Sequence, residues 1–249
     1  MKTKLLLYLI LSSILTSTGY GQSKNKLKNG KYDGEGILEF EDGASYTGEF
    51  KFGKFNGHGI YTWSNGDIYV GEWRNGEMSG YGEMKYSTGV VYKGFWYNNK
   101  YHKNGYLSLP DSSWYEGEFI EGKKQGKGMM IWSNGESYKG FFHNDLYHGM
   151  GVLKLTDGST YSGNFYQGKY NGTGTMWYSS GDIYEGNWTN GERNGIGTYS
   201  FKETGIIYKG GWLNGKYHGE GVLYYPNGEK IKVKFDNGNT VAGSLTVLD

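Results

Sequence analysis

The chain has 249 residues, of which 45 are glycine, 25 tyrosine, 11 phenylalanine and 8 tryptophan, with two prolines and no cysteine. Glycine is too infrequent and proline too rare for collagen, and an aromatic content of 18% argues against a disordered chain. The formal net charge of +1 lacks the basic excess typical of nucleic-acid binding, and the absence of cysteine excludes disulfides, thiolate metal sites and a cysteine-linked lipid anchor. The composition therefore indicates a repetitive β-protein rather than a domain with an aliphatic core.

Residues 1–21 predict a secretory signal peptide. Lys2 and Lys4 precede an apolar stretch from Leu5 to Leu15, and small residues follow it up to Gly21. The stretch is shorter than the roughly 20 residues that cross a bilayer, so cleavage after Gly21 is favoured over the alternative, an uncleaved membrane anchor. The rest of the chain is therefore expected outside the cytoplasm, as a secreted, periplasmic or envelope-associated protein.

From Tyr46 onward, each repeated unit begins with a tyrosine, followed two residues later by a glycine and after two more by an aromatic residue. The spacing is 23 residues, except for one step of 24 residues between Tyr184 and Tyr208. In an extended strand these three positions share one face, because side chains alternate. The copies are Tyr46-x-Gly48-x-Phe50, Tyr69-x-Gly71-x-Trp73, Tyr92-x-Gly94-x-Trp96, Tyr115-x-Gly117-x-Phe119, Tyr138-x-Gly140-x-Phe142, Tyr161-x-Gly163-x-Phe165, Tyr184-x-Gly186-x-Trp188 and Tyr208-x-Gly210-x-Trp212.

Each unit continues with a turn and a second predicted strand. Counted from the leading tyrosine, the fourteenth position is glycine, and the sixteenth and eighteenth are mostly apolar. Glycine at the third and fourteenth positions has no side chain, so an aromatic ring can lie flat over the backbone there. The fourteenth-position glycines are Gly59, Gly82, Gly105, Gly128, Gly151, Gly174, Gly197 and Gly221.

Turn residues separate the two strands of each unit. Asn75-Gly76 is typical of hairpin turns that need positive φ. Where the eighth position of a unit is not glycine it is Asn99 or Asp145, the residue types that best tolerate that conformation. This substitution pattern predicts a backbone requirement at the eighth position.

The predicted fold is all-β, an elongated repeat array of consecutive antiparallel β-hairpins in a single twisted sheet. An N-terminal half repeat or cap is expected over residues 22–45, and a C-terminal capping half repeat over residues 231–249. Between them, residues 46–230 form eight repeats that begin at residues 46, 69, 92, 115, 138, 161, 184 and 208.

The unit resembles the MORN repeat, named for the membrane occupation and recognition nexus, with the approximate pattern Tyr-x-Gly-x-Trp-x-x-Gly-Lys-x-His-Gly-x-Gly. The resemblance covers nearly all of the chain after about residue 24, as in a secreted member of bacterial type. It implies a module that binds proteins or associates with membrane lipid, often attached to a separate catalytic domain. In this chain the repeats fill nearly all of the sequence after about residue 24, so a separate catalytic domain is not expected.

The sequence predicts no catalytic residue, cofactor or metal site. Gly-x-Gly recurs, but it never completes a dinucleotide-binding or P-loop motif, and no nucleophile elbow is present. Histidines at the eleventh position lie at least two units apart, about 20 Å, which is too far for a shared metal. Glutamates at the fourth position, Glu49, Glu72 and Glu118, are predicted to form a solvated face.

A row of aromatic and histidine residues between the two strands is the candidate interaction site. Tyrosine and histidine are amphipathic and suit recognition surfaces. The alternative, which we favour, is that each ring caps its own hairpin. The row comprises the tenth-position residues Phe55, Tyr101, Tyr147, Tyr170 and Tyr217 and the eleventh-position residues His102, His148 and His218.

These observations favour a non-enzymatic scaffold for protein–protein or membrane-associated interaction. The alternative is an extracellular carbohydrate-binding protein whose aromatic row stacks on sugar rings. An enzyme is the least favoured reading, because no acid, base or nucleophile is clustered. An unidentified protein is the expected partner, membrane lipid or glycan is an alternative ligand, nucleic acid is not expected, and homodimerisation through an edge or face stays open.

Overall fold

The computed structural model describes residues 26–28 and 31–248, and the predicted signal peptide lies outside the described residues. Every regular element in the described part is a β-strand. The strands are β1 (Lys26–Lys28), β2 (Lys31–Glu39), β3 (Ser45–Lys51), β4 (Lys54–Thr62), β5 (Ile68–Arg74), β6 (Glu77–Lys85), β7 (Val91–Tyr97), β8 (Lys100–Ser108), β9 (Trp114–Ile120), β10 (Lys123–Ile131), β11 (Ser137–His143), β12 (Leu146–Lys154), β13 (Thr160–Tyr166), β14 (Lys169–Trp177), β15 (Ile183–Thr189), β16 (Glu192–Ser200), β17 (Ile207–Leu213), β18 (Lys216–Tyr224), β19 (Lys230–Asp236), β20 (Asn239–Thr240) and β21 (Thr246–Leu248).

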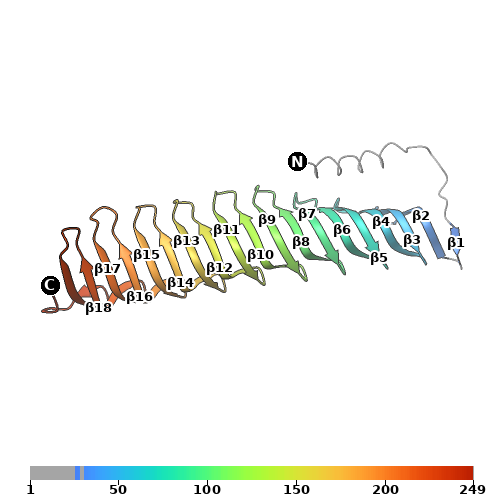
Figure 1. Cartoon of the computed structure of the whole chain (residues 1–249). Coiled ribbons are helices and arrows are strands. Elements are labelled where there is room, and N and C mark those ends of the chain that lie inside the picture. The colour runs from blue at the N-terminus through green and yellow to red at the C-terminus, as the bar shows by residue number, and fades with distance from the viewer. Residues whose placement is uncertain (1–25, 29–30, 249) are drawn as a thin grey trace.

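The strands form one long open ribbon in chain order (Figure 1). From β1 to β19 each strand pairs antiparallel with the next, and both β20 and β21 return to pair with β19. The predicted fold, an elongated array of antiparallel hairpins, is therefore confirmed. No helix in the described ranges is long and apolar enough to cross a membrane.

The turn after the first strand of each unit has two residues with positive φ, as in a type I′ hairpin. Asn75 and Gly76 have φ of 55° and 92°, and Asn99 and Asp145, at the eighth position of their units, have φ of 62° and 69°. The predicted backbone requirement at this position is therefore present. The Asn99 side chain also accepts a 2.8 Å hydrogen bond from the backbone N–H of Met78 in the preceding unit.

The leading tyrosines form the centre of the core. Each is at most 1% exposed, and each hydroxyl donates to the backbone carbonyl three residues later, as Tyr115 does to Glu118 at 3.0 Å. The ring covers the third- and fourteenth-position glycines: a Cβ on Gly105 would lie 2.4 Å from the Tyr92 hydroxyl oxygen. This is the predicted stacking of rings on glycine.

The fifth-position ring connects neighbouring units. Trp73 lies edge-on to Tyr69 in its own unit, with 5.1 Å between ring centroids, and edge-on to Tyr46 in the preceding unit at 5.6 Å. Its indole N–H donates to the carbonyl of Gly59 at 3.3 Å. Because such contacts recur along the ribbon, stability depends on interfaces between nearest-neighbour units.

Candidate interaction surfaces

The predicted interaction row is divided between the two sides of the sheet. We call the side that carries the leading tyrosines the core face and the opposite side the outer face. Tenth-position rings lie on the core face, packed against the core, and the adjacent eleventh-position histidines lie on the outer face because side chains alternate along a strand. The structure therefore does not bring the rings and the histidines into one continuous row.

The tenth-position rings pack on the leading tyrosine of their own unit. The rings of Phe55, Tyr101, Tyr147 and Tyr170 stack on it with centroid distances of 3.8, 3.7, 3.8 and 4.0 Å. Tyr217 meets Tyr208 edge-on at 4.6 Å. All five rings are half-buried, and a role for them in binding a partner stays a prediction.

Other residue types make the same contact in the remaining units. Met78 is buried, and the Lys124 ammonium lies 5.2 Å from the centre of the Tyr115 ring. The Arg193 guanidinium lies 5.7 Å from the ring centre of Tyr184, the leading tyrosine of its unit, and 4.3 Å from that of Trp212 in the next unit. Its Nη2 donates to the carbonyl of Gly215 at 2.7 Å. The tenth position therefore packs against the core in every unit, whatever its residue type.

The histidines of the predicted row have different surroundings. His102 packs against Tyr97, with 5.5 Å between ring centroids, and His148 lies between His143 at 5.5 Å and Tyr166 at 5.4 Å. His218 Nδ1 lies 3.6 Å from a carboxylate oxygen of Asp236. Within the described part of the chain, no group of three or more histidine, aspartate or glutamate residues has the geometry to hold a metal ion.

The fourth-position glutamates have a structural role that the sequence reasoning missed. Glu49, Glu72 and Glu118 each accept a hydrogen bond of 2.9–3.0 Å from a backbone N–H on the following strand. The carboxylate fills the space above a twelfth-position glycine with positive φ, so that a Cβ on Gly57 would lie 2.3 Å from the Glu49 carboxyl carbon. The glutamate thus satisfies the backbone at a β-bulge, where the register shifts between Gly48 and Phe50. No sequence signal marks this role, because glycine occupies the twelfth position in seven of the eight units, whether or not the fourth position is glutamate.

Two units replace this glutamate by phenylalanine. They are the third unit, which begins at Tyr92, and the fifth, which begins at Tyr138. Phe95 and Phe141 project from the outer face, and each is 41% exposed. In these two units the phenylalanine is paired across the hairpin with the eleventh-position histidine. In the first unit the fourth-position residue, Glu49, has no partner in the register of β3 and β4. The local geometry of the third and fifth units is therefore shared and distinct from that of the glutamate units.

Further exposed apolar side chains surround these two phenylalanines on the outer face. We call the whole set the outer-face band, which extends from the second to the sixth unit. Its members are between 36% and 55% exposed. They are Tyr81, Phe95, Tyr97, Tyr106, Ile120, Phe141, Met150, Val152, Tyr166 and Trp177.

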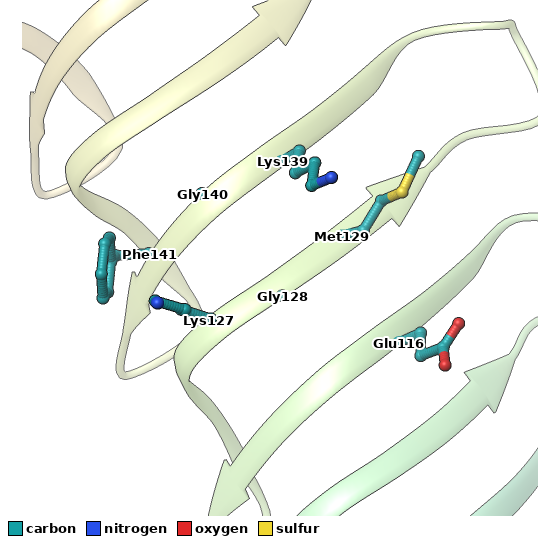
Figure 2. A pocket seen from close by; sticks show the side chains of 7 residues that line it. All are labelled: Glu116, Lys127, Gly128, Met129, Lys139, Gly140 and Phe141. Atoms are coloured by element: carbon teal, nitrogen blue, oxygen red, sulfur yellow. The ribbon is translucent and has the colours of Figure 1, made fainter.

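Two shallow hollows adjoin Phe141 within the band. One has the backbone of Gly128 and Gly140 at its centre, with Lys127 and Phe141 on one side and Glu116, Met129 and Lys139 on the other (Figure 2). The second hollow, on the far side of Phe141, is lined in addition by Gln125, His143, His148, Met150 and Asn164. Near Phe141 the outer face is therefore concave in two places as well as apolar.

Comparisons with known proteins agree with the repeat structure. The sequence profile of the MORN repeat matches residues 27–45, 46–68, 69–91, 92–113, 115–137, 138–160, 161–183, 184–203 and 208–230. Comparison with curated protein sequences gives no match.

Solved structures with some likeness to this chain include a TCP10 domain and a TCP10c domain. The TCP10 domain of Danio rerio CPAP in complex with a peptide of Danio rerio STIL is 12% identical, with 89% of this chain and 97% of that chain covered and a TM-score of 0.48. The TCP10c domain of Drosophila melanogaster Sas-4 is 10% identical, with coverage of 80% and 97% and a TM-score of 0.28. Likenesses of this size support no conclusion about function.

Proposed function

Because the chain belongs to the MORN repeat family, we propose that it is a non-catalytic scaffold that binds a protein partner on its outer face, outside the cytoplasm. The observation that carries this proposal is the outer-face band. Exposed apolar patches rimmed by polar residues are typical of interaction sites, and aromatic side chains supply much of the energy of protein interfaces.

The two faces of the ribbon differ in what they can offer a partner. On the core face, the leading and fifth-position rings are buried against one another and the tenth-position rings are half-buried on top of them. On the outer face, Tyr97, Met150 and Tyr166 are 50%, 55% and 53% exposed. A partner that covers these side chains removes their apolar surface from water, which favours association by roughly 25 cal/mol per Å² before the costs of binding.

The location outside the cytoplasm rests on the amino-acid pattern of residues 1–21. It is tested by expressing the full chain in a secreting host, separating the compartments and sequencing the N-terminus of the product. The proposal predicts an exported protein that begins at Gln22. A product that stays in the cytoplasm with an intact N-terminus would contradict this part of the proposal.

Binding is tested by immobilising the mature chain and two variants of it, and by passing fractionated extracytoplasmic proteins over each of the three. Ile120→Ser/Met150→Ser removes two members of the outer-face band. Ile196→Ser removes a 68% exposed side chain on the same face, beyond the band, and is the matched control. The proposal predicts a saturable protein ligand that the double variant loses and the control retains. Ligands retained equally by all three proteins would contradict it.

Carbohydrate binding is a second candidate, favoured by the hollow next to Phe141. The exposed Phe141 ring offers a stacking surface with the Asn164 amide beside it, whereas the Gln125 amide on the same rim is bonded to His143 and to the backbone N–H of Asn144. A glycan array decides this candidate. Salt-insensitive glycan binding that is lost in Phe141→Ser and retained in Ile196→Ser would support it, and an array without signal would exclude those glycans.

A further inference from the structure

The third and fifth units place two similar phenylalanine sites on the outer face. Each has an exposed phenylalanine at the fourth position, Phe95 or Phe141, paired in the ladder with a histidine, His102 or His148. In both sites a lysine ammonium lies over the phenylalanine ring, but the lysines come from different repeat positions. Lys103 belongs to the same unit as Phe95, whereas Lys127 belongs to the fourth unit and pairs with Phe141 across the neighbouring strand. Lys103 Nζ is 5.9 Å from the ring centre of Phe95, and Lys127 Nζ is 5.7 Å from that of Phe141.

Lys103 departs from the repeat pattern at a structural cost. The other seven units have glycine at the twelfth position, where φ is positive, and Lys103 occupies it with φ of 51°. A side chain in this region of φ is disfavoured relative to glycine by about 1 kcal/mol. Departures from local rules concentrate at functional sites, and this one places a cation beside an exposed ring.

Neither lysine is neutralised within the described residues. No carboxylate there lies within salt-bridge distance of Lys103 or Lys127. The Glu118 carboxylate, on the strand between them, accepts the backbone N–H of Lys127. The hollow beside Phe141 contains Lys127 and Lys139 against one carboxylate, Glu116 (Figure 2). Both sites thus combine an apolar ring with a lysine ammonium that makes no salt bridge in the described part of the chain.

The separation of the two sites fits an extended chain. Phe95 on β7 and Phe141 on β11 are four strands apart, or about 19 Å at the usual spacing between strands. An extended peptide rises about 3.3 Å per residue, so side chains six residues apart span about 20 Å. An even separation also directs both side chains to the same side of that peptide.

We propose that the outer face of the third to fifth units binds an extended acidic peptide that lies across the strands, with two large apolar side chains six residues apart packed against Phe95 and Phe141 and its carboxylates near Lys103 and Lys127. The inference rests on the proposed scaffold function and names the chemistry of its partner. The complementarity is between two apolar rings, unneutralised lysines and a ligand with the same spacing and the opposite charge.

The test uses a fluorescein-labelled synthetic peptide of about 12 residues, long enough to span both sites, with aspartates and two phenylalanines six residues apart. Binding to the mature chain is measured by fluorescence anisotropy at low and high salt. The expected result is binding that weakens with salt. It should also weaken about tenfold, or about 1.4 kcal/mol, when the phenylalanines are moved to three residues apart. A peptide with lysine in place of aspartate should not bind.

Protein variants locate the site. Phe95→Ser/Phe141→Ser should weaken binding at least about tenfold. Lys103→Gly/Lys127→Gln should weaken it less and reduce its salt dependence, and Lys103→Gly restores the repeat pattern, so this substitution does not endanger the fold. Ile196→Ser should bind as the parent does. Cooperative thermal unfolding of every variant, at a temperature close to that of the parent or above it, shows that the fold is retained; Lys103→Gly is expected to raise this temperature because glycine adopts positive φ without strain.

Several outcomes would overturn the inference: no binding of the acidic peptide, equal binding of the basic peptide, or equal binding by the phenylalanine variant. Binding of phosphatidylcholine–phosphatidylglycerol vesicles, or self-association, that depends on Phe95 and Phe141 while the peptide does not bind would assign the surface to lipid or to a second copy. If the peptide fails but Ile120→Ser/Met150→Ser still abolishes capture of a protein ligand, only the peptide inference fails. If neither experiment shows binding, the proposed function fails as well.

Discussion

The ring of Tyr101 lies parallel to the ring of Tyr92, with 3.7 Å between ring centroids and 12° between ring planes. The Tyr101 hydroxyl is 2.8 Å from the hydroxyl of Tyr86 in the preceding unit. One side chain thus covers the core of its own unit and makes a hydrogen bond to its neighbour. Stability in a single-layer sheet depends on such contacts, because no second layer formed by the described residues covers the core.

The stacking of rings on glycine predicts that Gly105→Ala is strongly destabilising. The added methyl group would lie 2.4 Å from the Tyr92 hydroxyl oxygen and 2.6 Å from ring carbons, so the ring must move. We expect a loss of about 3 kcal/mol in the free energy of unfolding, as for severe overpacking. Chemical denaturation measures it, with the neighbouring exposed Asn104→Ala as the control. Equal stability of the two variants would show that the ring does not depend on this glycine.

The buried hydroxyl of a leading tyrosine predicts a smaller effect. Tyr115→Phe removes the hydrogen bond to the carbonyl of Glu118 and leaves that carbonyl without its donor. The expected loss in unfolding free energy is about 1 kcal/mol. Tyr166→Phe, at an exposed ring, should be neutral within a few tenths of a kcal/mol. A neutral Tyr115→Phe would mean that water replaces the lost donor.

Arg193 predicts a difference between two substitutions at one site. Arg193→Ala removes the stacking on Trp212 and the hydrogen bond to Gly215, at an expected cost of about 2 kcal/mol. Arg193→Met should recover part of this loss, because Met78 packs at the equivalent position of the second unit. If methionine is no better than alanine, the charge rather than the packing determines stability at this position.

The buried tyrosines predict cooperative unfolding at high pH. Burial raises the pKa of Tyr138 and of Tyr208 to about 12, from an ordinary value of 10.0. Since the charged form is the deprotonated phenolate, the folded state retains protons that the unfolded state releases, and stability falls as pH rises from about 10 towards 12. The part of the tyrosinate absorbance that comes from the core tyrosines should therefore change together with the circular dichroism in this range, whereas exposed rings such as Tyr97 and Tyr166 do not require unfolding to ionise. Ionisation of the core tyrosines near pH 10 with the sheet intact would contradict this prediction.

The residues that determined the fold were visible in the sequence because they recur with a fixed period. Tyr46, Gly48 and Phe50 share a face by alternation alone, and Asn99 and Asp145 identified the positive-φ turn because they replace glycine at one position. The role of Glu49 was not visible, because its hydrogen bond to the His58 backbone crosses a β-bulge whose register depends on tertiary packing.

The candidate surface was predicted less well than the fold. Alternation separates Tyr101 from His102, so residues adjacent in sequence lie on opposite faces. The outer-face band was missed because Phe95 and Phe141 are exceptions at the fourth position. They replace glutamate in two units only, so no regular pattern marks them. Departures from the period, more than the period itself, indicated the surface proposed for binding.

Footprinting of the bound complex tests the proposed binding face most directly. A tyrosine-reactive label is applied to the mature chain with and without its captured protein ligand, and each modified residue is read by mass spectrometry. Binding on the outer face predicts protection of Tyr97 and Tyr166, with no change at Tyr61 and Tyr217 on the core face. Protection of Tyr61 and Tyr217 with Tyr97 and Tyr166 still labelled would contradict it.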